Sequence, residues 1–400
     1  MTPGYQPEEF REQPPPGEEG APAAAPPVRN GIDLLVADEF RAMRNLRLGL
    51  VTNHTGVTLD GRRTIDVLAQ ADDLFLSIIF APEHGIDGQS KDGEHIEDAV
   101  DEATSLPVIS LFGDRDRPSE DDLQPLDAVL FDVQDVGCRI YTYIATLGYL
   151  LEACAEHGRR VYVLDRPNLL GGNDVEGPSS DPSSESMTNY HPLPLRYGMT
   201  IGELARLLNG EREIGADLLV ATMAGWQRDL WHDQTGQRWI APSPNIIDLD
   251  AATLYPALGV LEGTNVSVGR GTAEPFHVIG APWIDARDLT AKLEKLALPA
   301  LRYEAVTFTP SDARHPHAGV ACNGVRFHIE ERADAFPTLL GVEIVRALRA
   351  DYPQWEYRKI EGLLARPDLV EAIEDKAPEL DEHWQPDPDF FEVRAKYLLY

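Results

Sequence analysis

The stretch FAPEHGIDG, residues 80–88, follows the hydrophobic run LFLSIIF and places Glu83 and His84 directly after a predicted strand. A simple reversal of the chain would need the proline and the glycine, but not an acid and an imidazole between them. Shielding by Phe80 and Pro82 favours the protonated carboxyl group, which suits a general acid, and His84 could hold that carboxyl or bind a substrate. The alternative is a turn in which Glu83 caps the next segment and His84 is a core residue. We favour the functional interpretation.

Polar side chains also follow three further predicted strands. They are Asn53 after LRLGLVT; Asp132, Gln134 and Asp135 after AVLF; and Asp165, Arg166 and Asn168 after VYVL. Open parallel sheets bind ligands beyond the carboxyl ends of their strands, so these groups are expected along one edge. Each of them alone is equally well explained as a helix cap or an Asx turn. Their combination favours a site.

Two other regions have the composition of a saccharide site. FDVQDVGCRIYTYIATLG adds Arg139, Tyr141, Thr142 and Tyr143, which offer rings for a sugar face and polar groups for hydroxyls. A core helix start would explain Tyr141 equally well, and Arg139 less well. The loop LEGTNVSVGRGTAEPF carries a set of polar residues among glycines that let backbone approach a ligand: Glu262, Asn265, Ser267 and Arg270.

Composition and missing motifs exclude several classes of protein. With 35 basic and 67 acidic residues, the net charge of −32 disfavours binding to nucleic acid and to anionic membranes. The sequence has no GxxxxGK[ST], no GxGxxG after the first strand, no GxSxG and no HExxH. Three cysteines without a CxxC pair argue against a disulfide scaffold and a cysteine zinc site. A metal site of His84, Asp132 and Asp135 is conceivable, but it offers few ligands.

The order of apolar segments predicts an α/β fold. Near-continuous apolar strands alternate with helices up to about residue 226, which indicates a Rossmann-like, mostly parallel sheet with helices on both faces. From about residue 300, strands of alternating polarity flank one helix, which predicts a smaller C-terminal α+β domain. We place a disordered Pro/Glu-rich tail at 1–29, the catalytic domain at 30–290 and the small domain at 291–400. The final YLLY is expected to dock.

No signal peptide and no run of 18 apolar residues is visible, so the sequence predicts a cytoplasmic protein without a membrane segment. A start codon upstream of the first residue would instead allow a periplasmic or secreted protein. The oligomeric state is not indicated by any pattern.

Several long motifs together resemble one family. APEHGIDG, LFDVQDVGCRIYTYIATLGYLLEA, LDRPNLLGG, PLPLRYGMTIGELARLLNGE and LEGTNVSVGRGTAEPFHVIGAPW are similar to the exo-β-N-acetylmuramidases of glycoside hydrolase family 171, from about residue 31 to the end. The resemblance implies release of N-acetylmuramic acid from the non-reducing end of peptidoglycan fragments, without a cofactor or a metal. It also implies a set of site residues: Glu83, His84, Asp132, Gln134, Asp135, Arg139, Tyr143, Arg196, Asn245, Glu262, Asn265 and Arg270.

Glycoside hydrolysis by this family would use Glu83 as the acid. Asp132, Asp135 and Glu262 compete for the role of second carboxylate, unless the substrate's own acetamide acts as the nucleophile. The lactyl carboxylate of the sugar calls for an arginine, and four stand in these motifs: Arg139, Arg166, Arg196 and Arg270. The alternatives are a metal-dependent hydrolase and a non-catalytic muropeptide-binding protein.

Overall fold

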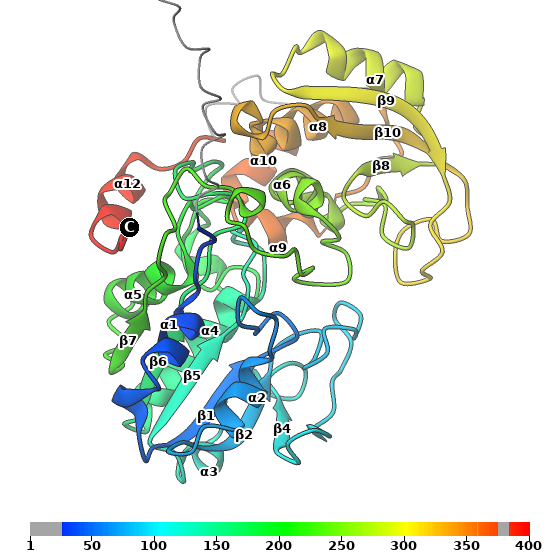
Figure 1. Cartoon of the computed structure of the whole chain (residues 1–400). Helices are drawn as coiled ribbons and strands as arrows, with labels where there is room; N and C mark the ends of the chain where they lie inside the picture. Colours follow the sequence, from blue (N-terminus) through cyan, green and yellow to red (C-terminus); the bar gives the residue numbers. More distant parts are fainter. Residues whose placement is uncertain (1–25, 358, 375–383) are drawn as a thin grey trace, which may run out of the picture.

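The large domain of the protein is built on a seven-stranded sheet (Figure 1). The structure is a computed structural model that describes residues 26–357, 359–374 and 384–400. In spatial order the strands are β3 (Ala99–Val100), β4 (Pro107–Ser110), β2 (Phe75–Ala81), β1 (Arg47–Thr52), β5 (Ala128–Asp132), β6 (Arg160–Leu164) and β7 (Leu218–Ala221). All neighbours are parallel except β3, which pairs antiparallel with β4.

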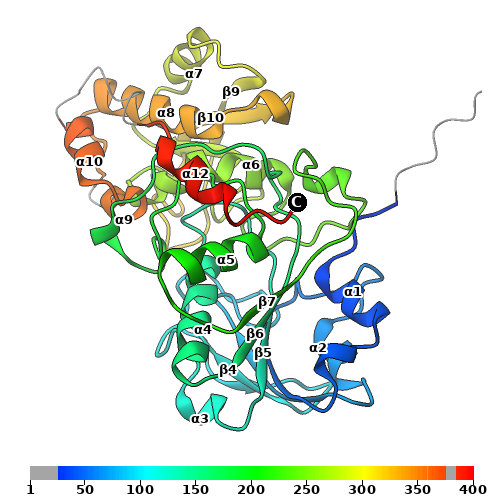
Figure 2. The ribbon, with the colours of Figure 1, turned by 90° about the vertical axis from the view of Figure 1, so that its left-hand side faces the viewer.

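Helices cover both faces of this sheet because successive strand residues point to opposite sides. Leu50 of β1 and Leu130 of β5 pack in one buried layer, and their neighbours Val51 and Phe131 pack in the other. The first layer is covered by α1 (Gly31–Ala37) and α2 (Thr64–Ala69), and the second by α3 (Glu120–Leu123), α4 (Tyr143–Glu156) and α5 (Ile201–Glu211) (Figure 2). The predicted Rossmann-like fold is confirmed.

The smaller domain holds a three-stranded antiparallel sheet in the order β8 (Val278–Ala281), β10 (Cys322–Ile329) and β9 (Leu301–Phe308). Its helices are α6 (Leu249–Leu258), α7 (Ala286–Lys295), α8 (Pro337–Asp351), α9 (Ile360–Leu364) and α10 (Pro367–Glu374). Helix α7 packs on β9 and β10, and α6 packs on α8 (Figure 1). The predicted division at 290/291 would separate β8 from the sheet in which it pairs.

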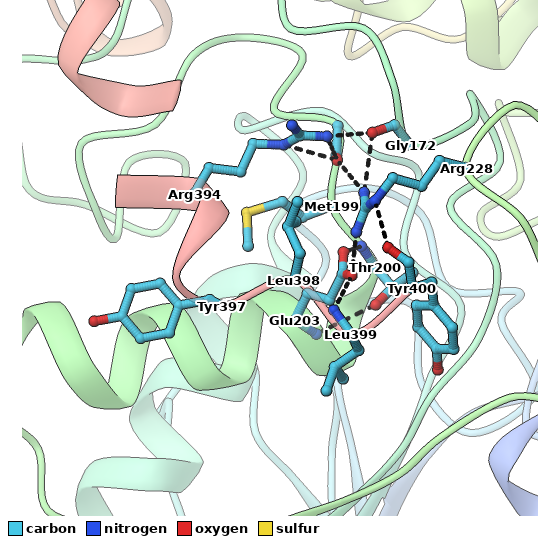
Figure 3. Close-up of polar contacts among 12 residues, drawn as sticks. Gly172, Met199, Thr200, Glu203, Arg228, Arg394, Tyr397, Leu398, Leu399 and Tyr400 are labelled. Atoms are coloured by element: carbon cyan, nitrogen blue, oxygen red, sulfur yellow. Dashed lines mark hydrogen bonds and ion pairs between the residues drawn. The ribbon is translucent and has the colours of Figure 1, made fainter. Parts of the chain in front are cut away.

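Both ends of the described chain are attached to the large domain. Val28, within the predicted tail, is buried and its N–H donates to Thr235 O, while residues 1–25 lie outside the described residues. The last helix, α12 (Pro388–Ala395), leads to the YLLY segment, which docks beside α5 (Figure 3). There Leu399 N donates to Glu203 at 2.7 Å, and Tyr400 OH donates to Asp165 at 2.8 Å.

Candidate active site

The EHG motif forms a tight turn directly after β2. His84 and Gly85 both have left-handed backbones, with φ of 73° and 76°, a conformation that costs a non-glycine residue energy and that clusters at functional sites. His84 Nδ1 lies 2.8 Å from Ser90 O, which makes Nδ1 the protonated ring nitrogen. The turn therefore fixes His84 to the following loop and directs Glu83 inward, where it is 8% exposed.

The Glu83 carboxyl group is held from two elements. Its Oε1 accepts a hydrogen bond of 2.9 Å from Gly93 N, and its Oε2 accepts one of 2.7 Å from Thr142 Oγ1 at the start of α4. A hydroxyl group can donate to a carboxylate or accept from a carboxylic acid. Thr142 can therefore serve Glu83 in either protonation state.

Behind Glu83 stands a small aromatic cluster. Tyr143 OH accepts from Asn53 Nδ2 at 2.9 Å and lies 3.3 Å from the carbonyl oxygen of Glu83. Burial raises the pKa of Tyr143, so its hydroxyl stays neutral. Tyr141 meets Tyr143 edge to face with centroids 4.8 Å apart, and Tyr255 meets Tyr141 at 6.0 Å. The predicted residue Tyr143 therefore contacts Glu83, and Asn53 is joined to Glu83 through Tyr143.

The structure also has a cavity of about 480 Å³, which we call the Arg270 cavity. It is lined by Glu262, Gly263, Thr264, Asn265, Val266, Val268, Arg270, Arg314, His315, Pro316, Glu356 and Lys359. Arg270 binds Glu262 at 3.0 Å and Asp92 at 3.1 Å. Asp92 directly precedes Gly93, the donor to Glu83, so the Glu83 turn is linked to Arg270 through Gly93 and Asp92.

Asn265 is a lining residue whose side chain is already engaged. Its Nδ2 donates to Gln354 O, and its Oδ1 accepts from Glu356 N. Asn265 therefore contributes to the shape of the wall of the Arg270 cavity. Asn245 is half-buried, and within the described part of the chain no hydrogen bond joins it to Glu83 or Arg270.

The predicted carboxylate Asp132 has no oxygen free for a substrate. It is fully buried, its Oδ1 is 2.6 Å from Arg166 Nε, and its Oδ2 accepts from Thr64 Oγ1 at 2.5 Å. Asp132 anchors the end of β5 to α2 and to the segment after β6.

Asp135 is also enclosed. Its Oδ2 accepts from Gly137 N at 2.7 Å and from Tyr197 OH, while its Oδ1 is buried and finds no hydrogen-bond partner in the described chain. Burial raises the pKa of Asp135 to about 6. Of the three candidate second carboxylates, Glu262 lines the Arg270 cavity, whereas Asp132 and Asp135 are not among the residues that line it.

Two of the four predicted arginines are buried and bind groups inside the protein. Arg139 donates to the carbonyl oxygens of Leu193, Leu363 and Leu364, and burial lowers its pKa to about 9. Arg196 binds Glu176 at 2.6 Å and is 1% exposed. Their sequence motifs do not distinguish a buried cation from one that meets a ligand, and the geometry leaves neither open to a substrate.

Gln134 and Arg166 lie at a second cavity of about 330 Å³, which we call the Arg166 cavity. Its lining includes neither Glu83 nor Glu262. The predicted residues are thus divided between the Glu83 turn with the Arg270 cavity, the Arg166 cavity, and the interior.

Sequence reasoning missed Asp92 and singled out neither Arg314 nor His315 as a site residue. Asp92 lies in the charged segment SKDGEHIED, which has no periodicity and follows no strand, so no pattern marked it.

The metal site considered as an alternative is not supported. No group of three His, Cys, Asp or Glu suited to an ion occurs within residues 26–357, 359–374 and 384–400. Both oxygens of Asp132 are engaged by Arg166 and Thr64, so the set proposed with His84 does not fit an ion. Nor does any helix in these ranges have the length and apolar character to cross a bilayer.

Comparison with known proteins gives a consistent result over nearly the whole chain. The family model described as exo-beta-N-acetylmuramidase NamZ, N-terminal, matches residues 48–250, and the C-terminal model of the same name matches 253–400. The peptidoglycan beta-N-acetylmuramidase NamZ of Bacillus subtilis is 36% identical over 402 residues, which cover 96% of this chain and 94% of that protein.

Solved structures agree with this. Two crystal structures of DUF1343 family proteins from Bacteroides fragilis superpose with TM-scores of 0.85 and 0.73, at 31% and 29% identity. Each comparison covers 93% of this chain and 99% of the other. The resemblance in the sequence is confirmed, and the chain belongs to the exo-β-N-acetylmuramidase family of glycoside hydrolases.

Proposed function

We propose that this protein is an exo-acting glycoside hydrolase that releases N-acetylmuramic acid from the non-reducing end of peptidoglycan fragments, with Glu83 as general acid. The observation that carries the assignment of Glu83 is its placement. A buried carboxyl group sits in a strained turn at a strand end and is linked through Gly93 and Asp92 to a polar cavity. The activity itself is supported by membership of the family.

In this mechanism Glu83 protonates the oxygen of the leaving sugar. The hydroxyl group of Thr142 supports the carboxylic acid before the transfer and the carboxylate after it. Gly93 N donates to the other oxygen throughout, and so holds the side chain in one orientation.

The second carboxylate in the proposal is Glu262. Arg270 positions it, because Arg270 Nη2 donates to Glu262 Oε2 at 3.0 Å. It can act on the sugar directly, or orient the acetamide group if that group attacks the anomeric carbon. Asp132 and Asp135 support the fold instead.

The lactyl carboxylate of the substrate needs a cation that is not already neutralised. Arg270 is held by Glu262 and Asp92, and Arg314 by Asp312 at 2.7 Å. Within the described residues Lys359, on the rim of the Arg270 cavity, has no ion-pair partner. We assign it to the lactyl group.

The test is a chromatographic assay on defined muropeptides, run beside chromogenic N-acetyl-muramide and N-acetyl-glucosaminide. Free N-acetylmuramic acid from the muropeptide, and cleavage of the muramide alone, are expected. Tight binding of muropeptide without release of sugar would identify a binding protein and reject the proposal. Activity abolished by EDTA and restored by zinc would reject the metal-free mechanism.

A further inference from the structure

The Arg166 cavity lies where an open α/β sheet ordinarily binds ligands. The chain runs from β1 outward through β2 and β4, and then returns to place β5, β6 and β7 on the other side, so the order switches between β1 and β5. The cavity lies beyond that point and is lined by Asn30, His54, Thr55, Val57, Thr58, Leu59, Asp60, Gly61, Gln134, Arg166, His232, Gln237, Arg238 and Ile240. Its volume suits a ligand of monosaccharide size.

Two of its buried side chains keep an unused polar atom. Arg166, 4% exposed, uses Nε for Asp132 and Nη2 for Val57 O at 3.0 Å, while its Nη1 has no partner in the described chain. Gln134, 7% exposed, donates Nε2 to the Asp135 and Pro167 carbonyls, and its Oε1 accepts nothing from those residues. Neither atom is among the fully buried atoms without a partner, and both residues line the cavity.

Two more buried side chains that line the cavity also keep an unused polar atom. Asn30, 3% exposed, accepts at Oδ1 from Gln237, and its Nδ2 meets no acceptor in the described residues. His232, 6% exposed, packs edge-on against Trp239, and both its ring nitrogens lack a protein partner there. Buried polar groups are normally hydrogen-bonded, so four with spare capacity around one space point to a polar ligand.

The charge of the cavity selects an anion. Asp60 is occupied by Arg62 at 2.9 Å and by Thr58, whereas Arg238 is exposed and has no carboxylate partner in the described chain. Arg166 is balanced by Asp132, so Arg238 leaves an excess of positive charge. In a chain of net charge −32 this excess is unusual.

We propose that the Arg166 cavity is a second binding site, separate from Glu83, for a small hydroxylated carboxylate of sugar-acid size. Arg166 Nη1 and Arg238 bind the carboxylate group, because guanidinium groups make charge-assisted hydrogen bonds to it. Asn30, Gln134 and His232 bind the hydroxyl groups, since together they offer both donors and an acceptor. The site does not depend on the hydrolase activity proposed above.

Isothermal titration calorimetry on the full chain tests this, with D-gluconate, N-acetylmuramic acid and N-acetylglucosamine as probes. Gluconate should bind at least about tenfold more tightly than the neutral sugar. Binding of N-acetylmuramic acid as well would mark the reaction product as a ligand of the site, and its failure to bind while gluconate binds would mark another sugar acid. In either case gluconate binding should persist in Glu83→Gln, which separates this site from the hydrolytic one.

Two variants locate the binding. His232→Phe keeps the ring against Trp239 and removes both nitrogens, and it should weaken gluconate binding roughly tenfold. Arg238→Ala should weaken it about threefold, and Arg302→Ala, an exposed arginine on β9, is the matched control without effect. Thermal unfolding of each variant checks that it is folded. No binding of gluconate to the wild type, or unchanged binding in both variants, overturns the proposal.

Discussion

Replacing Asp132 by asparagine separates a structural role from a catalytic one. Asp132 and Arg166 form a buried ion pair, with exposures of 0% and 4% and a contact of 2.6 Å. Asparagine keeps the shape and can still accept from Thr64, but it removes the charge that balances Arg166. The guanidinium group then stays buried without its counter-ion.

The cost follows from the burial of that charge. Removal of one partner of a buried ion pair destabilises a protein by about 3–5 kcal/mol. For a domain of this size that corresponds to a fall in the melting temperature of roughly 6–20 °C. Circular dichroism during heating and urea unfolding at constant pH measure it. At a temperature where the variant is folded, hydrolysis should stay within about threefold of wild type, because Asp132 is fully buried and both its oxygens are engaged by Arg166 and Thr64.

The double variant Asp132→Asn/Arg166→Met serves as control. Removing both charges should recover most of the lost stability, because neither ion is then left unpaired. If Asp132→Asn instead melts with the wild type and loses activity a hundredfold or more, Asp132 is a catalytic carboxylate and our interpretation of its contacts is wrong.

Four further outcomes are expected. Because the raised pKa of Asp135, about 6 against an ordinary 3.8, means that the folded state holds this proton more tightly, its ionisation destabilises the fold as pH rises. The free energy of unfolding of Asp135→Asn should therefore rise relative to that of wild type by about 2–2.5 kcal/mol between pH 4 and 7, and a flat difference would contradict this. Tyr400→Phe leaves Met223 N, which donates to that hydroxyl at 2.7 Å, without an acceptor, so urea unfolding should show a loss of about 1–3 kcal/mol. At a temperature where the variant is folded, Glu262→Gln should lower kcat by about a hundredfold or more, and near-normal turnover would remove it from the mechanism. Lys359→Ala should raise KM for the muramide roughly threefold to tenfold at constant kcat, and an unchanged KM would exclude it from carboxylate binding.

The fold could be predicted from the sequence because its signals are local. Apolar runs such as AVLFD, bounded by polar residues, mark strands buried on both faces, and they correspond to β5 and its neighbours in the structure. Strand β8, with only four residues, lies next to a glycine-rich loop and gives no comparable signal. Its pairing with β10 depends on contacts distant in sequence.

The site could be predicted only in part, for a related reason. A strand end locates Glu83, because the position of the carboxyl group follows from the topology. The sequence cannot show whether Arg139 and Arg196 turn inward, since that depends on carbonyl oxygens and carboxylates supplied by distant segments such as Leu363–Leu364. For the same reason the sequence did not indicate that Asp92 joins the Glu83 turn to Arg270.

The most direct test of the role of Glu83 compares two substrates in Glu83→Gln. Glutamine can keep the contacts to Gly93 and Thr142, so the variant loses the proton and not the local structure. On a muramic-acid disaccharide, whose leaving sugar needs protonation, kcat/KM should fall by about 10²–10⁴. On a dinitrophenyl muramide, whose leaving group needs no proton, it should fall far less. Equal losses on both substrates, or near wild-type turnover of the disaccharide, would contradict the assignment of Glu83 as general acid.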